Sequence, residues 1–231
     1  MERQFNPVEL ELMDRPQPVS PELERDLENI RQLNRWFGSY ALISMFLSGW
    51  IKPGSRLRIV DLATGSGDIP RLIAECGRKI GAELRIDALD RQSATLEIAQ
   101  KLSVPYPEIS FVEGNILEWR PAEPYDVVFC TLALHHFSND DAVRVLQRCQ
   151  ELSHKFVLVS DLRRSWMATI GVHLLTATMF REPMSKHDAR LSIARAFSFS
   201  ELNQLAQRAG WTNFGLKTYP FARQAIWLEA R

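Results

Sequence analysis

Short apolar runs rich in β-branched residues alternate with helical stretches through the middle of this chain of 231 residues. The length and composition of these runs predict strands. The five predicted strands span residues 57–62, 84–90, 109–113, 125–130 and 155–161. Strands that alternate with helices pair in parallel, and the helices cover both faces of the sheet. The alternation therefore predicts an α/β fold with a doubly wound sheet.

The N-terminal part of the chain precedes this alternation. Residues 1–19 hold three of the twelve prolines, which predicts an irregular peripheral arm. Helices are predicted over 20–37, where a serine and a proline open an amphipathic pattern, and over 40–50. We therefore treat residues 1–54 as an N-terminal arm and helical cap.

The core, residues 55–231, has three further features. A long segment at about 163–197 is expected to insert as a helical lid after the fifth strand. A capping box predicts a helix over 198–209. Two strand-like runs, 211–219 and 223–229, are joined by a short turn, which predicts an antiparallel hairpin at the end of the sheet.

The charges of the chain balance, with 28 basic and 28 acidic residues, so no global charge favours nucleic acid or an anionic membrane. Cys76, Cys130 and Cys149 are widely spaced, which argues against a disulfide framework and a structural zinc cluster. No apolar leader opens the chain, and the longest apolar run, residues 41–51, is too short for a bilayer. We expect a cytoplasmic protein with a small-molecule partner, no membrane span and no resident metal ion, and leave the oligomeric state open.

The first predicted strand ends in an acid and passes through glycines into a helix, in the sequence DLATGSGD at residues 61–68. Glycine lets a ligand approach the backbone closely, and the helix that starts near Asp68 directs free N–H groups toward such a ligand. An ordinary tight turn between a strand and a helix uses the same glycines, so this loop alone does not establish a binding site.

A second acid, Asp90, closes the next predicted strand, 23 residues after Gly67. At this spacing a carboxylate accepts hydrogen bonds from both ribose hydroxyls of an adenosine. A dinucleotide-binding enzyme shares both features, but it normally has a third glycine where this chain has Pro70. Asp61 would repel a pyrophosphate and attract the ammonium group of a sulfonium ligand. The charge therefore favours a sulfonium ligand.

With these motifs, residues 55–162 resemble the class I S-adenosylmethionine-dependent methyltransferases, particularly the small-molecule branch that includes the ubiquinone and menaquinone methyltransferases. The resemblance implies a Rossmann-like seven-stranded sheet, with six strands parallel and the last antiparallel, and S-adenosyl-L-methionine as the cofactor. More distantly, residues 10–38 and 161–197 resemble bacterial methyltransferases that accompany type III polyketide synthases.

The resemblance also implies which residues hold the cofactor. The loop at 61–68 would wrap its methionine part, with Ala63 where the family usually has its first glycine, a change that a negative φ would make mild. Asn115 replaces the usual acid but keeps an oxygen for the adenine amino group. Arg35 is expected to close over the cofactor carboxylate, with a solvated arginine as the alternative. The expected cofactor-binding residues are Asp61, Ala63, Thr64, Gly65, Gly67, Asp68, Asp90, Arg91, Asn115, Ile116, Thr131 and Arg35.

Residues 131–137, TLALHHF, closely resemble the segment after the fourth strand of the quinone methyltransferases. His135 or His136 is a candidate general base, since a neutral imidazole takes a proton from a phenol or hydroxyl near neutral pH. The alternatives are that these histidines form a wall of the acceptor pocket or order the loop by hydrogen bonds. Methyl transfer needs little covalent help in a dry pocket, so a base is dispensable.

The predicted lid carries apolar residues at helical spacing. Core packing explains each of them singly. As a group they are expected to cover a hydrophobic or aromatic acceptor, whose oxygen substituents the polar residues of the lid would orient. The expected acceptor-pocket residues are Trp166, Ile170, His173, Met179 and His187.

We expect O-methylation of a hydrophobic phenol or related metabolite, with C-methylation of a quinone precursor as the close alternative, because both need a positioned nucleophile and an apolar pocket. A noncatalytic adenosyl-cofactor-binding protein would keep the glycine loop but have a blocked or solvent-open acceptor cavity. Asp61 and Pro70 disfavour a nicotinamide-dependent oxidoreductase, and the neutral charge disfavours RNA methylation.

Overall fold

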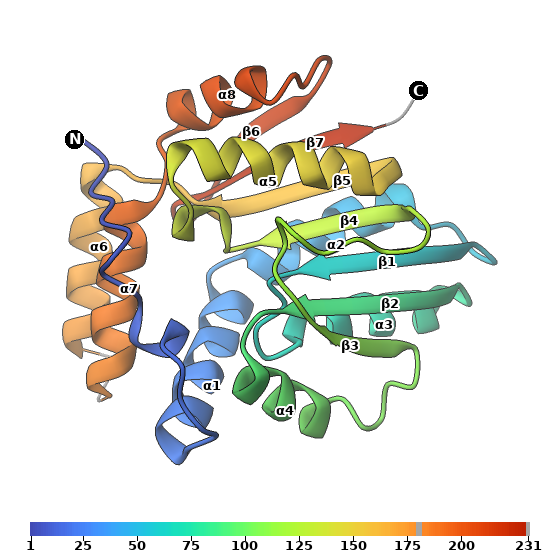
Figure 1. Ribbon diagram of the computed structural model, residues 1–231, viewed down its shortest axis with the longest axis horizontal. Coiled ribbons are helices and arrows are strands. Elements are labelled where there is room, and N and C mark those ends of the chain that lie inside the picture. Colours follow the sequence, from blue (N-terminus) through green and yellow to red (C-terminus); the bar gives the residue numbers. More distant parts are fainter. Residues whose placement is uncertain (179–181, 230–231) are drawn as a thin grey trace.

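One sheet of seven strands organises residues 1–178 and 182–229, which the computed structural model describes (Figure 1). The strands are β1 (Arg56–Leu62), β2 (Glu83–Asp90), β3 (Ile109–Glu113), β4 (Tyr125–Thr131), β5 (Ser153–Leu162), β6 (Gly215–Tyr219) and β7 (Arg223–Glu229). Their order is β3-β2-β1-β4-β5-β7-β6. The first five strands pair in parallel, and β7 is antiparallel to both β5 and β6. The predicted Rossmann-like doubly wound sheet with an antiparallel last strand is confirmed.

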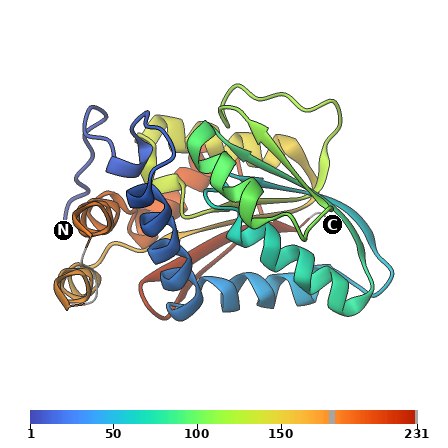
Figure 2. The ribbon, with the colours of Figure 1, turned by 90° about the horizontal axis from the view of Figure 1, so that it is seen from below.

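Helices cover both faces of this sheet. The helices are α1 (Pro21–Trp36), α2 (Ser39–Trp50), α3 (Asp68–Ile80), α4 (Ser93–Leu102), α5 (Asn139–Leu152), α6 (Trp166–Thr178), α7 (Pro183–Arg195) and α8 (Phe199–Arg208), with short 3-10 helices η1 (Leu12–Asp14) and η2 (Leu134–His136). Figure 2 shows α2 and α3 on one face of the sheet and α5 on the other. The buried side chains of α2 and α3 belong to one core cluster, and those of α5 and α8 to the other. Among the described helices, none is both long enough and apolar enough to cross a membrane.

The two central strands are buried on both faces. Ile59 and Val60 of β1 and Val127 and Val128 of β4 are 0% exposed. A strand covered on both sides needs apolar residues at successive positions, which is why these segments have nearly continuous apolar sequences. Asp61 is buried in the same strand, so the carboxyl end of β1 holds an acid inside the protein.

The predicted helix starts are present in the structure. The hydroxyl of Ser20 accepts a hydrogen bond from the N–H of Leu23, and a proline follows Ser20 at the start of α1. Ser198 and Glu201 form the predicted capping box at the start of α8. These caps satisfy N–H groups that the first turn of a helix leaves without partners.

The N-terminal arm, residues 1–14, lies across the carboxyl ends of the parallel strands, beside α6 and α7 (Figures 1 and 2). The N–H of Gln4 donates to the carbonyl oxygen of Ala194 at 3.1 Å. The guanidinium of Arg3 donates to the carbonyl oxygens of Arg195 and Phe137, at 2.5 and 2.7 Å. The arm is irregular and lies at the surface, and polar contacts to distant segments hold it over the functional edge of the sheet.

The predicted strand at 211–219 begins only at Gly215. Trp211 instead packs in the hydrophobic core, and its indole N–H donates to the carbonyl oxygen of Leu146 at 3.2 Å. An aromatic side chain gains more from core burial than from an edge strand, so packing overrides the local strand pattern here.

Gly215 lies opposite Trp227 in the β6–β7 ladder. A Cβ atom at Gly215 would lie 2.1 Å from the indole ring of Trp227. We expect Gly215→Ala to lower the free energy of unfolding by about 1–3 kcal/mol, because the ring has to shift. Gly49→Ala is the matched control, since nothing lies within 4 Å of a Cβ there, and it should be neutral or stabilising by up to about 1 kcal/mol. Urea unfolding followed by circular dichroism measures both, and equal effects would contradict the prediction.

Candidate functional site

A cavity of about 900 Å³ opens at the carboxyl ends of the parallel strands. Its walls come from the loops after β1 to β5, from α1, α6 and α7, and from the N-terminal arm. Doubly wound sheets bind ligands at this edge, where the loops of neighbouring strands meet. The predicted cofactor residues that line the cavity are Asp61, Ala63, Thr64, Gly65, Asp68, Asp90, Arg91, Asn115, Ile116 and Thr131.

The loop after β1 turns sharply into α3. Gly65 and Gly67 have φ angles of 54° and 72°, in the left-handed region that glycine adopts without penalty. Gly67 does not line the cavity but forms the turn at the start of α3. Ala63 has a φ of 58°, so the negative φ that would make this departure mild is absent. A left-handed φ costs an alanine about 1–2 kcal/mol, and this strain lies in the wall of the cavity.

Asp61 is a buried acid with one free oxygen. Its Oδ2 atom accepts a hydrogen bond from the hydroxyl of Thr64 at 2.7 Å, while Oδ1 has no hydrogen-bond partner among the described residues. Burial raises the pKa of Asp61 to about 8, and the nearby carboxylates of Asp68 and Asp90 act in the same direction. The site therefore holds a carboxyl group that would ionise readily beside a cation.

Asp68 connects the loop to the N-terminal helices. Its Oδ2 atom accepts hydrogen bonds from the side-chain amide of Asn34 and the hydroxyl of Tyr40, each at 3.0 Å. Asn34 lines the cavity, whereas Arg35 is exposed and lines a separate, smaller pocket. The expected place of Arg35 over the cofactor carboxylate is therefore contradicted, because one step along a helix turns a side chain by about 100°.

Asp90 already has two backbone partners. The N–H of Gly65 donates to its Oδ2 atom at 2.8 Å, and the N–H of Gln92 donates to Oδ1 at 3.0 Å. Burial raises the pKa of Asp90, and these donors oppose that rise. Each carboxylate oxygen keeps a further lone pair for a ligand hydroxyl. Asp90 therefore lines the cavity with lone pairs that could accept hydrogen bonds from ribose hydroxyls, as predicted.

The predicted adenine residues lie beyond Asp90. Ile116 is buried in the cavity wall. The exposed Asn115 uses its side-chain oxygen to accept a hydrogen bond from the N–H of Leu117 at 3.0 Å, and this oxygen has one more lone pair. The guanidinium of Arg91 lies 3.5 Å from a carboxylate oxygen of Asp14. The assigned adenine contacts remain predictions.

His135 is buried against the acid that ends β5. Its ring Nδ1 atom lies 2.7 Å from Oδ1 of Asp161, and its backbone N–H donates to Oδ2 of the same carboxylate at 2.8 Å. Burial alone lowers the pKa of His135, but the carboxylates of Asp161 and Glu11 outweigh it and raise the pKa to about 10. The raised pKa favours the protonated imidazolium, which argues against His135 as a neutral base, and the role of His135 or His136 as a base or as a wall of the acceptor pocket stays a prediction.

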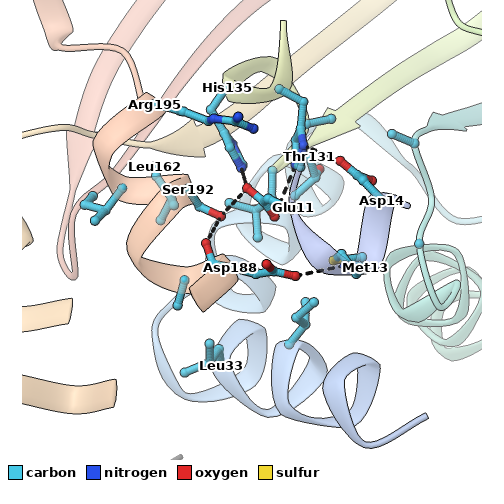
Figure 3. A pocket seen from close by; sticks show the side chains of 18 of the residues that line it. Glu11, Met13, Asp14, Leu33, Thr131, His135, Leu162, Asp188, Ser192 and Arg195 are labelled. Carbon is cyan, nitrogen blue, oxygen red and sulfur yellow. Dashed lines mark hydrogen bonds and ion pairs between the residues drawn. The ribbon is translucent and has the colours of Figure 1, made fainter. Parts of the chain in front are cut away.

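Glu11 of the N-terminal arm lies beside His135 (Figure 3) and also pairs with His136. Its carboxylate lies 3.6 Å from Nε2 of His135 and 3.9 Å from Nε2 of His136. The Nδ1 atom of His136 lies 2.8 Å from a carboxylate oxygen of Asp14. Burial alone would lower the pKa of His136 and raise the pKa values of Glu11 and Asp14. The attraction between the imidazolium and the carboxylates outweighs burial, so the pKa of His136 is raised and those of Glu11 and Asp14 are lowered. The sequence analysis missed Glu11 and Asp14, because no local pattern marks residues that reach the site only through tertiary folding.

The lid helix α6 faces the cavity with a different side from the one predicted. Met167, Gly171, Val172 and Leu175 line the cavity and repeat at helical spacing. The expected acceptor residues Trp166, Ile170 and His173 point away from the cavity, with Trp166 66% and Ile170 52% exposed. These expectations were wrong because the apolar stripe is wider than the side of α6 that faces the cavity. Met179 lies outside the described residues.

On α7, Asp188 lines the cavity and the expected residue His187 does not. The carboxylate of Asp188 accepts hydrogen bonds from the N–H groups of Leu12 and Met13, at 2.8 and 3.0 Å (Figure 3). One helix turn later, the hydroxyl of Ser192 donates to Glu11 at 2.7 Å. Thus polar side chains of α7 bind the N-terminal arm, and His187 is exposed on the side of α7 that faces away from the cavity.

Residues 59–155 match the family described as a methyltransferase domain. A 2-phytyl-1,4-naphtoquinone methyltransferase of Thermosynechococcus vestitus (strain NIES-2133 / IAM M-273 / BP-1) is 32% identical over 81 residues, which cover 35% of this chain and 35% of that protein. A trans-aconitate 2-methyltransferase of Klebsiella pneumoniae (strain 342) is 30% identical over 86 residues, which cover 37% of this chain and 31% of that protein. The chain thus spans about a third of the length of these curated relatives.

Solved methyltransferase structures share the fold. The plantazolicin methyltransferase BpumL, in complex with a monoazolic desmethylPZN analog and SAH, matches with a TM-score of 0.67 at 14% sequence identity and 91% coverage of each chain. Human N-acetylserotonin methyltransferase, in complex with SAM, matches with a TM-score of 0.64 at 15% identity, covering 90% of this chain and 55% of that chain. At these identities the likeness shows the fold alone. Residues 59–155 thus match a methyltransferase domain, and the fold of the chain is the one that these solved methyltransferases have.

Proposed function

We propose that the protein binds S-adenosyl-L-methionine in the cavity and transfers its methyl group to a small hydrophobic molecule. The observation that carries this proposal is Oδ1 of Asp61, which is buried in the cavity wall and has no hydrogen-bond partner among the described residues. A buried carboxyl without a partner is costly, and a cationic ligand offsets that cost. The cofactor carries an ammonium and a sulfonium group, whereas a dinucleotide would bring a pyrophosphate toward the acids of the cavity.

The other end of the cavity suits an adenosine. Asp90 retains lone pairs for ribose hydroxyls, Ile116 offers an apolar surface to the adenine ring, and Asn115 offers an amide oxygen beside it. When bound, the cofactor supplies an electrophilic methyl group. The residues of this chain bind it, orient the acceptor and exclude water.

The remaining walls support a hydrophobic acceptor. Leu33 of α1, Leu162 at the end of β5, and Met167 and Leu175 of α6 contribute apolar surface. We favour O-methylation of a phenolic molecule. The cavity extends from the β1 loop to α6, which favours an enzyme over a noncatalytic cofactor-binding protein. The free cysteines fit the cytoplasmic location that we propose.

C-methylation of a quinone precursor is the second candidate. The 32% identity over 81 residues with a 2-phytyl-1,4-naphtoquinone methyltransferase favours it. Both reactions rely on an in-line approach to the methyl group, and neither requires the neutral histidine base that the charge on His135 argues against.

We expect Asp61→Asn and Asp90→Ala to weaken binding of S-adenosylhomocysteine by about 10- to 100-fold, because each removes charge-assisted hydrogen bonds. Arg35→Ala is the control and should leave the affinity unchanged, since Arg35 is exposed outside the cavity. Calorimetric titration with S-adenosylmethionine, S-adenosylhomocysteine and NAD measures the effect. Binding of NAD alone, or unaltered affinity in both acid variants, would refute the assigned pocket.

The affinity for S-adenosylhomocysteine should rise with pH. The pKa of Asp61 is raised to about 8, so the carboxyl is mostly protonated below that value and has to lose its proton to pair with the ligand ammonium. Between about pH 6 and 7.5 the affinity is expected to increase by up to about tenfold per pH unit. Titrations across this range test it, and Asp61→Asn should flatten the dependence. A flat profile for the unmodified protein would contradict the role of Asp61.

The cavity side of α6 provides a test of the acceptor pocket. Leu175→Arg should lower methyl transfer to a hydrophobic phenol by about tenfold or more, because it places a charge in the apolar wall. Ile170→Arg, on the exposed side of the same helix, should leave turnover unchanged. Mass spectrometry and NMR of products from phenols and naphthoquinols distinguish a methyl ether from a ring methyl group. Equal turnover in the two variants would place the acceptor elsewhere.

A further inference from the structure

Three side chains bring metal-binding atoms together on one wall of the cavity. They are Glu11 from the N-terminal arm and His135 and His136 from η2, and one ligand atom of each lies within 4.8 Å of the other two. The side chains of Glu11 and His135 are 3% exposed, and that of His136 is 22% exposed. Two imidazoles and one carboxylate, nearly shielded from water, are a donor set that binds divalent transition metals.

A carboxylate lies beside the Nδ1 atom of each imidazole. Nδ1 of His135 forms a hydrogen bond with Asp161 at 2.7 Å, whereas Nδ1 of His136 lies 2.8 Å from Asp14 as an ion pair without hydrogen-bond geometry. Histidines that bind metals usually have a carboxylate next to the other ring nitrogen, which fixes the ring and leaves Nε2 for the ion. Here both Nε2 atoms face Glu11, the third member of the cluster.

The distances from the two Nε2 atoms to the carboxylate of Glu11 suit a shared metal ion better than direct hydrogen bonds. Nε2 of His135 is 3.6 Å and Nε2 of His136 is 3.9 Å from the nearer oxygen of Glu11, which is too long for a hydrogen bond. Ligands about 2.0–2.1 Å from a tetrahedral ion lie roughly 3.3 Å apart, so the two distances to Glu11 are close to those of a bound ion, and all three ligand atoms lie within 4.8 Å of one another. The hydroxyl of Ser192 donates to Oε1 of Glu11 at 2.7 Å and steadies that carboxylate (Figure 3).

The surrounding charges also favour a cation. The carboxylates of Asp14 and Asp161 contact the two rings, and Asp188 holds the backbone of the arm next to Glu11. Two arginines lie nearby: Arg91 is 3.5 Å from the oxygen of Asp14 that His136 also approaches, and Arg3 donates to the backbone carbonyl oxygen of His135 at 3.1 Å. Among the described residues, neither guanidinium forms a hydrogen bond or ion pair with the ring nitrogens of the histidines or with the carboxylate of Glu11, where the ion would bind.

We propose that Glu11, His135 and His136 form a binding site for one divalent transition-metal ion, for which Zn²⁺ is the best match. All three residues line the cavity, so an open coordination position would face it. There the ion would stabilise the oxyanion that an acceptor hydroxyl forms when its proton passes to bulk water. That role rests on the proposed methyl transfer, whereas binding of the ion does not.

Calorimetric titration of chelator-treated, full-length protein with Zn²⁺ tests the site. We expect one ion per chain, with affinity reduced at least tenfold by Glu11→Gln, His135→Ala or His136→Ala, and by about 10- to 100-fold in Asp14→Asn. The control His173→Ala should bind Zn²⁺ as the unmodified protein does, because His173 is exposed and its ring contacts only the carbonyl oxygen of Thr169. Mg²⁺, which prefers oxygen ligands, should not compete.

Two further readouts separate a lost site from a misfolded variant. Circular dichroism reports whether each variant is folded, and Co²⁺ added to the chelator-treated protein should give the visible absorption of a four-coordinate ion, which Asp14→Asn, a change outside the three ligands, should weaken. No stoichiometric Zn²⁺ binding, or equal binding by folded ligand variants, would overturn the proposal. S-adenosylhomocysteine titrated into the same samples tests the methyltransferase proposal separately, since either ligand can bind while the other fails.

Discussion

The contact between Asp161 and His135 positions most of the functional edge. Asp161 ends β5, and its buried carboxylate accepts the backbone N–H of His135 and lies beside its ring. This contact fixes η2, and η2 in turn presents two imidazoles to Glu11 of the N-terminal arm. A buried carboxylate requires such partners, since isolation from water would otherwise favour its protonated form. One acid at a strand end therefore connects the sheet, the loop after β4 and the arm over the cavity.

Acids stand at or next to the ends of three of the parallel strands, and each has a different set of partners. Asp161 has an imidazole, Asp90 has two backbone N–H groups, and Asp61 has one hydroxyl and one free oxygen. The less completely an acid is satisfied by the protein, the more it gains from a ligand. In the order of the strands Asp61 of β1 lies between Asp90 of β2 and Asp161 of β5, so the least satisfied acid stands in the middle of this edge, where we place the charged part of the cofactor.

The sequence predicted the features that depend on residues close together in the chain. Apolar runs and glycines specified the strands, the sheet and the loop after β1, because those elements depend on side-chain periodicity and on backbone freedom near their own positions. It did not predict that Ala63 would adopt a left-handed φ, since the surrounding turn imposes that conformation. The sequence pattern placed Arg35 and Ile170 at the cavity, whereas the structure places Asn34 and Leu175 there. The rotation of a helix about its axis decides which of its side chains faces the cavity, and the sequence does not specify that rotation. Glu11 lies 124 positions before His135, so only the folded topology brings them together.

The N-terminal arm covers an apolar cavity but is attached to the rest of the protein mainly by polar contacts. Of residues 1–19, all of which the structure describes, no apolar side chain is fully buried, whereas Glu11 is. Apolar contacts are few: Met13 and Val19 pack against the small cluster of Leu23, Leu27 and Ile98, outside the two large core clusters. Most other contacts of the arm are hydrogen bonds and ion pairs, whose groups water can also solvate. Separating such a cover from the cavity would expose less apolar surface than separating a helix from the hydrophobic core.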